Sequence, residues 1–174
     1  FQPRVQAWWQ DLHRYYTDMG IQGFWNDMNE PAVFNERMTL DADARHHIDG
    51  AVVEHEAVHN AYGLLMCEAT ASAIVEQCAQ RPFVLTRAGY AGIQRSAAVW
   101  TGDNRSSWEH LRLSVPMLLN MGLSGVVFTG VDIGGFMDDS RPELFTRWMQ
   151  LGCFYPLMRN HCAIGQVRQE PWSF

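Results

Sequence analysis

Lysine is absent from the sequence, because all 13 of its basic residues are arginine. This absence excludes a Schiff-base lysine and the lysine of a phosphate-binding P-loop. No basic run occurs and the formal net charge is −6, which argues against a nucleic-acid-binding surface. No apolar run is long enough to span a bilayer and no signal-like region is present, so we expect no membrane partner. The compartment is left open.

Cysteine is scarce, with 4 residues at positions 67, 78, 153 and 162 and no C-x-x-C motif. Cys67 and Cys78 lie in a segment with helical spacing, which separates them by roughly 16 Å along the helix axis. If this segment is helical, a disulfide between them is excluded. We expect four free or buried thiols, and this pattern implies no oxidising compartment.

The composition is that of a globular chain. The 174 residues are 47% hydrophobic and 18% charged, which allows a sizeable core. The chain begins F-Q-P-R, without methionine, and ends P-W-S-F, so we expect it to be part of a longer protein. The 7 tryptophans suit either a large aromatic core or sugar stacking.

Hydrophobic periodicity and turn residues predict alternating helices and strands. Helices are predicted at residues 4–19, 52–79, 108–121 and 142–151, with C-caps at Gly20 and Gly122 and an N-cap at Ser106 or Ser107. Strands are predicted at residues 23–25, 82–86, 97–100 and 125–129, with a strand-like segment at 154–158 and a loop at 35–50. This alternation implies an α/β fold with a parallel sheet.

Polar side chains follow the carboxyl ends of the predicted strands. They are Asp27, Arg87, Asp103, Asp132 and His161. In a β/α barrel this edge is the catalytic face, but a complete eight-stranded barrel typically needs about 250 residues. We therefore expect either a smaller open sheet or a barrel whose first strands lie upstream.

Residues 23–31 are the stretch around which the chain is organised. The apolar Phe24 and Trp25 suit a buried strand, and Pro31 cannot continue a strand ladder. A carboxylate at the mouth of a buried strand is costly unless it is hydrogen-bonded or used. Asp27 is therefore either a catalytic nucleophile or a loop acid that caps the next element.

Four segments together resemble glycoside hydrolase family 31, the family of α-glucosidases and α-xylosidases. The segments are residues 23–30 (G-F-W-N-D-M-N-E), 100–104 (W-T-G-D-N), 130–136 (G-V-D-I-G-G-F) and 159–161 (R-N-H). They occur in the family's order, and their residues are most similar to those of enzymes of the glucosidase II type. The resemblance implies a (β/α)8 TIM-barrel catalytic domain, of which residues 1–174 supply about strands 4 to 8. It also implies an α-glucoside oligosaccharide substrate and no cofactor or metal.

The resemblance implies a retaining, exo-acting α-glucosidase with Asp27 as nucleophile and Asp103 as acid/base. Retaining glycosidases place two carboxyl groups about 5 to 5.5 Å apart, and the acid/base must hold a proton near neutrality. By resemblance, seven residues contact the sugar: Arg87, Trp100, Asp132, Phe136, His161, Phe34 and Met28.

All of these sugar-binding assignments except Asp132 have a structural alternative. Arg87 would instead form a salt bridge, His161 would be a satisfied core histidine, and the aromatic residues and Met28 would pack in the core. At the level of function, an α-xylosidase, a transglucosylase and an inactive carbohydrate-binding fragment also fit the sequence.

Residues 55–59 (H-E-A-V-H) match the H-E-x-x-H motif of zinc proteases. On a helix, His55 and His59 share a face and could bind zinc, with Glu56 as the base. The longer metzincin motif requires glycine at position 62, where the sequence has Tyr62. By the resemblance, residues 59–63 are instead part of a structural helix of the glycosidase barrel.

Overall fold

The computed structural model describes residues 1–174 and divides into two units. The N-terminal unit is Phe1–Ala98 and the C-terminal unit is Val99–Phe174.

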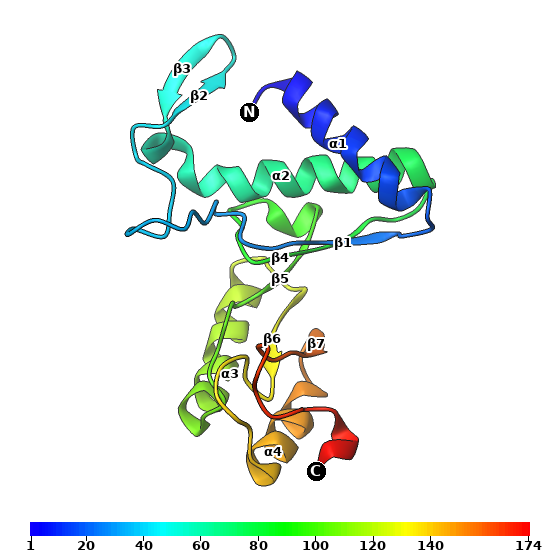
Figure 1. Ribbon diagram of the computed structural model, residues 1–174, viewed down its shortest axis with the longest axis vertical. Helices are drawn as coiled ribbons and strands as arrows, with labels where there is room; N and C mark the ends of the chain where they lie inside the picture. Colours follow the sequence, from blue (N-terminus) through cyan, green and yellow to red (C-terminus); the bar gives the residue numbers. More distant parts are fainter. The chain divides into compact units, whose positions relative to one another are not determined.

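A β-α-β arrangement, preceded by one helix, forms the frame of the N-terminal unit. Its elements are α1 (Pro3–Thr17), β1 (Gly23–Asn26), α2 (His55–Cys78), β4 (Phe83–Thr86) and the 3-10 turn η1 (Ile93–Arg95). Strands β1 and β4 pair in parallel with Asn26 opposite Thr86, so Asp27 and Arg87 leave the strands at the same edge. Figure 1 shows α1 and α2 on one side of this strand pair.

Close packing of α2 against the strand ends depends on a glycine. A Cβ atom on Gly63 would lie 2.9 Å from both the Cβ and the carbonyl oxygen of Ala88, and 3.1 Å from the carbonyl oxygen of Asn29. Ala88 follows Arg87, and Asn29 lies two residues after Asp27. The missing side chain at position 63 therefore lets the helix approach both loops that carry predicted site residues.

A hairpin precedes α2 that the sequence analysis did not predict. Strands β2 (Arg45–Ile48) and β3 (Ala51–Glu54) pair in antiparallel fashion around a turn at Asp49 and Gly50, which have φ values of 47° and 85°. Positive φ at both central residues is typical of a tight hairpin turn. The predictions of a loop through residue 50 and of a helix from residue 52 are therefore wrong at this point.

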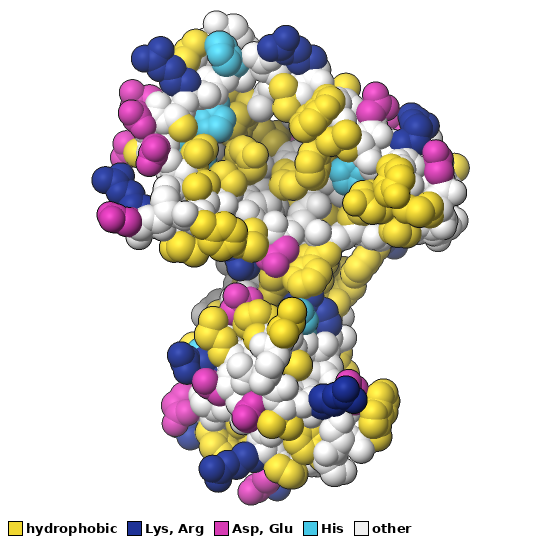
Figure 2. Space-filling view, viewed as in Figure 1, with side chains coloured by type: hydrophobic (Ala, Val, Ile, Leu, Met, Phe, Trp, Pro, Cys, Tyr) yellow, Lys and Arg dark blue, Asp and Glu magenta, His cyan; other side chains and the backbone are white.

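Helix α1 is confirmed, although it ends at Thr17 with Asp18 as its C-cap, and Gly20 lies in the following turn. Its apolar side chains are largely exposed within the N-terminal unit, with exposed fractions from 46% for Val5 to 71% for Tyr15. Figure 2 shows hydrophobic side chains gathered over this part of the chain.

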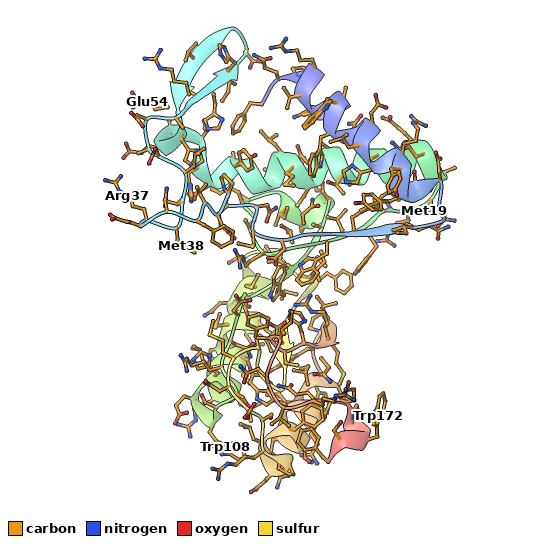
Figure 3. All side chains as sticks on the ribbon, viewed as in Figure 1. Met19, Arg37, Met38, Glu54, Trp108 and Trp172 are labelled. Atoms are coloured by element: carbon orange, nitrogen blue, oxygen red, sulfur yellow. The ribbon has the colours of Figure 1, made fainter.

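The C-terminal unit contains parallel strands flanked by helices. Its elements are β5 (Ala98–Trp100, which begins at the boundary), α3 (Trp108–Leu123), β6 (Thr129–Ile133), α4 (Pro142–Gly152), β7 (Leu157–Asn160) and the 3-10 turn η2 (Pro171–Ser173). Strand β6 pairs in parallel with both β5 and β7. Its core consists of Leu118, Val131, Ile133, Leu144 and Trp148. Trp108 and Trp172 lie at the surface of this unit (Figure 3).

The predictions for the C-terminal unit are confirmed in type and corrected in their bounds. Ser107 caps α3, since its hydroxyl oxygen accepts a hydrogen bond from the backbone N–H of His110 at 3.2 Å. Gly122 is not the C-cap, because α3 continues to Leu123 and Ser124 caps it. Strand β6 begins at Thr129 rather than at residue 125, because its buried run includes polar residues that an apolar pattern does not reveal.

The β1–β4, β5–β6 and β6–β7 ladders are all parallel, which confirms the α/β fold class. All four cysteines are free, as predicted. No helix of the structure has the length and apolarity needed to cross a bilayer.

Candidate active site

Four of the five predicted strand-end residues follow their strands. Asp27 comes directly after β1, Arg87 after β4 and His161 after β7, and Asp103 lies in the segment between β5 and α3. The prediction that Asp132 follows the end of its strand is wrong, since this residue lies inside β6 and is fully buried.

Arg87 joins two carboxylates in the N-terminal unit. Its Nε lies 2.8 Å from Glu30 Oε1 and its Nη2 lies 2.9 Å from Glu30 Oε2, which is the two-pronged geometry of a strong charged pair. The same Nε lies 3.6 Å from Asp27 Oδ1. The hydrogen bonds from Arg87 lower the pKa of Glu30 below its ordinary value, although partial burial opposes this shift. Sequence analysis assigned no role to Glu30.

The Asp27 carboxylate is oriented by its own backbone. Its Oδ1 accepts a hydrogen bond from the Met28 N–H at 2.8 Å, and Met28 adopts a left-handed φ of 55°. The Asp27 side chain remains 36% exposed. Asp27 caps no helix, because the next element along the chain is the strand β2. The arrangement is an oriented, accessible carboxylate beside a guanidinium group.

Two buried asparagines hold the segment on either side of Asp27. Asn26 donates to the Thr70 hydroxyl at 3.0 Å, and Asn29 donates to the Thr86 hydroxyl at 2.9 Å. Both amides also approach the sulfur of the buried Cys67, at 3.6 and 3.8 Å. Burial raises the pKa of the Cys67 thiol, so this group stays neutral and serves the packing of the loop.

Met28 and Phe34 lie in the segment after β1. Met28 is half-buried, whereas Phe34 is 82% exposed, so core packing within the N-terminal unit does not explain Phe34. The same segment carries Arg37 and Met38, which Figure 3 shows at its outer edge.

In the C-terminal unit the structure brings together Trp100, Asp132 and Arg159. The Nη2 of Arg159 lies 2.7 Å from Asp132 Oδ1, and the guanidinium carbon lies 5.0 Å from the centre of the Trp100 ring. Trp100 is only 2% exposed. Sequence analysis noted Arg159 only as part of a motif, and its pairing with Asp132 follows from the register of β6 and β7.

The other predicted residues of this unit lie in connected loops. The rings of Phe136 and His161 stack with centroids 5.1 Å apart, and His161 is half-buried. The side-chain amide of Asn104 donates to the carbonyl oxygen of Asp132 at 3.1 Å, and the backbone carbonyl of Asn104 accepts from the Phe136 N–H at 2.8 Å. These bonds fix the residue next to Asp103, which is itself exposed within the unit.

The H-E-x-x-H segment forms a hydrogen-bonded chain of histidines. His55 Nδ1 lies 2.9 Å from His46 Nε2, and His55 Nε2 lies 2.8 Å from His59 Nδ1. His46 and His59 thus occupy opposite ends of the His55 ring, and the three side chains do not converge on one ion. The proposed base, Glu56, is exposed. This geometry does not fit a zinc protease centre.

Comparison with known families gives a match over the whole chain. The family model described as "Glycosyl hydrolases family 31 TIM-barrel domain" matches residues 1–174. Alpha-glucosidase 2 of Bacillus thermoamyloliquefaciens is 58% identical over 172 residues, which cover 98% of this chain and 22% of that protein. Neutral alpha-glucosidase AB of Homo sapiens is 46% identical over 176 residues, covering 98% of this chain and 18% of that protein. The chain thus spans about a fifth of the length of these relatives.

Solved structures show the same similarity. A chain of the ER glucosidase II heterodimeric complex matches with a TM-score of 0.91 and 42% identity, covering 99% of this chain and 19% of that chain. A dextranase of Flavobacterium johnsoniae, complexed with glucose, matches with a TM-score of 0.88 and 32% identity, covering 99% of this chain and 22% of that chain.

Proposed function

Because the chain belongs to glycosyl hydrolase family 31, we propose that the protein carrying it is a retaining, exo-acting α-glucosidase. The substrate we propose is an oligosaccharide with a terminal α-linked glucose. The observation that carries the proposal is the oriented, accessible Asp27 carboxylate beside the Arg87–Glu30 pair.

The alternation of parallel strands and helices is that of part of the family's (β/α)8 barrel, and the expectation of an independent open sheet is dropped. We propose that residues 1–174 supply about strands 4 to 8 of one catalytic domain. Catalytic groups of such barrels lie at the carboxyl ends of the strands, where Asp27 and Arg87 are found.

The proposed reaction has two displacements. Asp27 attacks the anomeric carbon and forms a glycosyl ester, while Asp103 gives its proton to the departing glycosidic oxygen. Asp103 then takes a proton from water, the water oxygen attacks the anomeric carbon, and Asp27 is released as a carboxylate. The Arg87 guanidinium lies beside the Asp27 carboxylate, which the first displacement uses and the second restores.

The sugar would be held by the other residues that the sequence analysis assigned. We propose that Arg87 donates to sugar hydroxyls, and that the stacked Phe136 and His161 present an aromatic face and a ring N–H. Asp132 acts in the same region through Arg159, which it orients. Trp100, Phe34 and Met28 complete the proposed wall of the glucose subsite.

The test uses the protein encoded by the complete coding frame. We expect turnover of p-nitrophenyl α-glucoside with or without a metal chelator, and less turnover of the corresponding α-xyloside. Asp27→Ala should lose nearly all turnover, and added azide should restore part of it by giving a β-glucosyl azide. Full turnover by Asp27→Ala would exclude the proposed nucleophile. A preference for the xyloside, or sugar transfer in place of hydrolysis, would indicate the α-xylosidase or transglucosylase function instead.

A further inference from the structure

The chain of His46, His55 and His59 lies in the N-terminal unit, outside the set of residues proposed to contact the sugar. His55 is 2% exposed, and both of its ring nitrogens are engaged by other imidazoles. His46 and His59 are half-buried. A buried polar group is normally satisfied by hydrogen bonds. In a row of three hydrogen-bonded imidazoles, these bonds also limit how many protons the three rings can hold together.

Counting protons shows that this chain holds at most one positive charge with its bonds intact. Each of the two contacts between the rings has room for one proton, and the two outer ring nitrogens can each carry one more. Three neutral imidazoles account for three protons, so only one further proton can be added. A second added proton would place two N–H groups against each other. The charge can move along the chain as the bridging protons shift from one nitrogen to the next.

One end of the histidine chain, His59, lies on the side of α2 that packs against the loops carrying Arg87 and Glu30. His59 lies one helical turn before Gly63 on α2, so the two positions share a face of the helix. Gly63 packs against the backbone of Asn29, the residue that precedes Glu30. His59 therefore lies on the face of α2 that approaches the loop carrying Glu30. A positive charge on His59 lowers the pKa of Glu30, as the smallest contribution after Arg87 and the backbone hydrogen bond of Glu30 itself.

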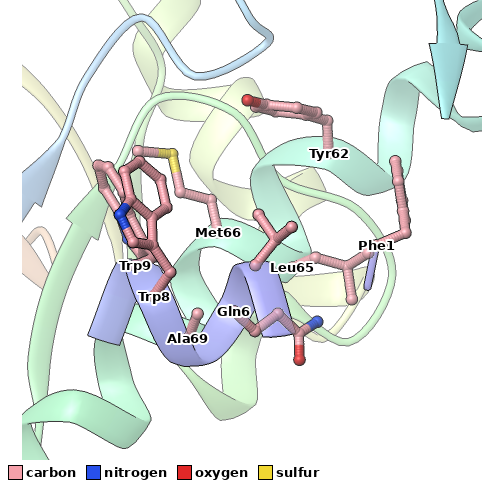
Figure 4. Close-up of a pocket in the computed structure, with 9 residues that line it drawn as sticks. Phe1, Gln6, Trp8, Trp9, Tyr62, Leu65, Met66 and Ala69 are labelled. Carbon is pink, nitrogen blue, oxygen red and sulfur yellow. The ribbon is translucent and has the colours of Figure 1, made fainter. Parts of the chain in front are cut away.

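The other end is covered by aromatic groups. The Phe1 ring meets His46 edge-on with centroids 5.1 Å apart, and the Tyr62 ring lies 6.2 Å from His46 and 6.5 Å from His55. Figure 4 shows Phe1 and Tyr62 at the edge of an apolar pocket of about 310 Å³ between α1 and α2. These contacts limit the access of water to the middle of the chain.

We propose that the His46–His55–His59 chain is a shared-proton positioning element that sets the charge facing Glu30. Through Glu30 it controls how firmly Arg87 is held beside Asp27. The consequence for catalysis rests on the proposed role of Asp27 as nucleophile, whereas the coupling between the histidines and Glu30 does not.

The expected pH response follows from the groups around the chain. Burial, and then the neighbouring His59 and His46, lower the pKa of His55. Burial lowers the pKa of His46. His46 and His55 therefore take up a proton only when the pH falls below 6.5, the ordinary histidine value.

The remaining ionisable groups nearby do not oppose this response. Glu30 lies near the His59 end of the histidine chain. Arg45 and His47 flank His46 on β2 but point to the other face of the strand by alternation, with Glu54 opposite Arg45. A charged chain competes with Arg87 for the Glu30 carboxylate, so activity should fall in mild acid.

The kinetic test uses substitutions that keep one hydrogen-bonding atom in place and remove titration. A glutamine amide replaces an imidazole Nε2 and an asparagine amide replaces an Nδ1, so His46→Gln and His59→Asn are the matched choices. His47→Gln, at the exposed neighbouring position, is the control. In His46→Gln and His59→Asn we expect kcat/KM at pH 5, divided by kcat/KM at pH 7, to rise by about 3- to 10-fold. This is the change expected when the pKa that governs the acid limb of the pH profile falls by about half to one unit. Equal profiles for His46→Gln, His59→Asn and His47→Gln would overturn the proposal.

A second measurement does not depend on activity. Hydrogen–deuterium exchange at the imidazole C2 position, followed by mass spectrometry, reports the pKa of His55 in the intact protein. We expect Glu30→Gln to lower this pKa, because a negative charge at the end of the chain is lost, and His46→Gln to raise it. If the pKa of His55 is unchanged in Glu30→Gln, the proposed coupling between the histidines and Glu30 is refuted, even if the protein is an active α-glucosidase. If the pKa of His55 is lowered in Glu30→Gln but the protein hydrolyses no α-glucoside, the coupling is supported and the proposed function is refuted.

Discussion

Arg159 and Asp132 face each other across the parallel strands β7 and β6, with Arg159 Nη2 2.7 Å from Asp132 Oδ1. Asp132 is fully buried, whereas the Arg159 side chain is 21% exposed. An ionised carboxylate in such a place is costly unless a charged partner remains beside it. The arginine is therefore a requirement for the integrity of β6 as well as a neighbour of Trp100.

Arg159→Met should destabilise the protein by about 3 kcal/mol, since it leaves a buried carboxylate without this partner. Asp132→Asn should cost less, because a neutral amide is cheaper to bury. The matched control is Arg147→Met on α4, where the arginine side chain is 52% exposed and lies 4.0 Å from Glu143. Thermal unfolding of the three variants measures the difference. Equal midpoints for Arg159→Met and Arg147→Met would contradict the importance of the buried pair.

Gly63→Ala should impair activity more than stability. The added Cβ would lie 2.9 Å from Ala88 atoms, so the loop that carries Arg87, or the helix itself, must shift. The control is Gly122→Ala in α3, where a Cβ would meet nothing within 4 Å. That exchange should stabilise the helix by about 0.5 to 1 kcal/mol. We expect kcat/KM to fall for Gly63→Ala alone, and unchanged kinetics in both variants would show that the close approach of α2 is not needed.

His13 should make stability depend on pH. It is 6% exposed, its ring packs edge-on against Phe24 and Trp9, and its Nδ1–H donates to the Trp9 carbonyl oxygen at 2.7 Å. Burial lowers its pKa, partly offset by the bond to Trp9. The folded protein therefore resists protonation that the unfolded chain accepts below pH 6.5, and stability is lost as the pH falls from there through the folded-state pKa.

The test of this pH dependence is the unfolding temperature measured between pH 8 and pH 5. His13→Leu should flatten the curve below pH 6.5, whereas His47→Gln, at an exposed site, should leave it as in the wild type. A His13→Leu curve that falls as steeply as the wild type would assign the loss of stability to other groups.

Local signals in the sequence were sufficient to predict many of the helices and strands. Pro142 marks the start of α4, the apolar run before Arg87 gives β4, and Ser107 caps α3. The same signals placed Asp27 and Arg87 at strand ends, because parallel strands put their carboxyl ends at a common edge.

The features that the sequence did not reveal depend on partners far along the chain. Asp132 lies buried within β6, where Arg159, 27 positions later in the sequence, supplies an opposite charge. Glu30 acquires a role from Arg87, which is 57 positions away. The β2–β3 hairpin was missed because its strands have only 4 residues each, and neither R-H-H-I nor A-V-V-E shows the apolar–polar alternation that marks a half-buried strand.

Asp103 should matter most for substrates with poor leaving groups. If it protonates the departing oxygen, Asp103→Ala should reduce hydrolysis of a glucose disaccharide by roughly 10²- to 10⁴-fold, the usual range for general acid catalysis. Aryl glucosides with acidic phenols need less protonation and should lose less in the first step. Parallel rate measurements on both substrates decide the point, since equal losses would indicate a structural role for Asp103.

The stereochemical outcome tests the role of Asp27 most directly. If Asp27 attacks the anomeric carbon, the configuration is inverted once on forming the ester and once again when water releases the sugar. The first product from an α-glucoside should then be α-glucose. A site in which a carboxylate activates water instead requires carboxyl groups roughly 6.5 to 9.5 Å apart and gives the β-anomer by a single inversion. Proton NMR spectra recorded within minutes of mixing, before the anomers interconvert, distinguish the two products. A first-formed β-anomer would mean that Asp27 never bonds to the sugar, and its contact with Arg87 would then have to serve a different step.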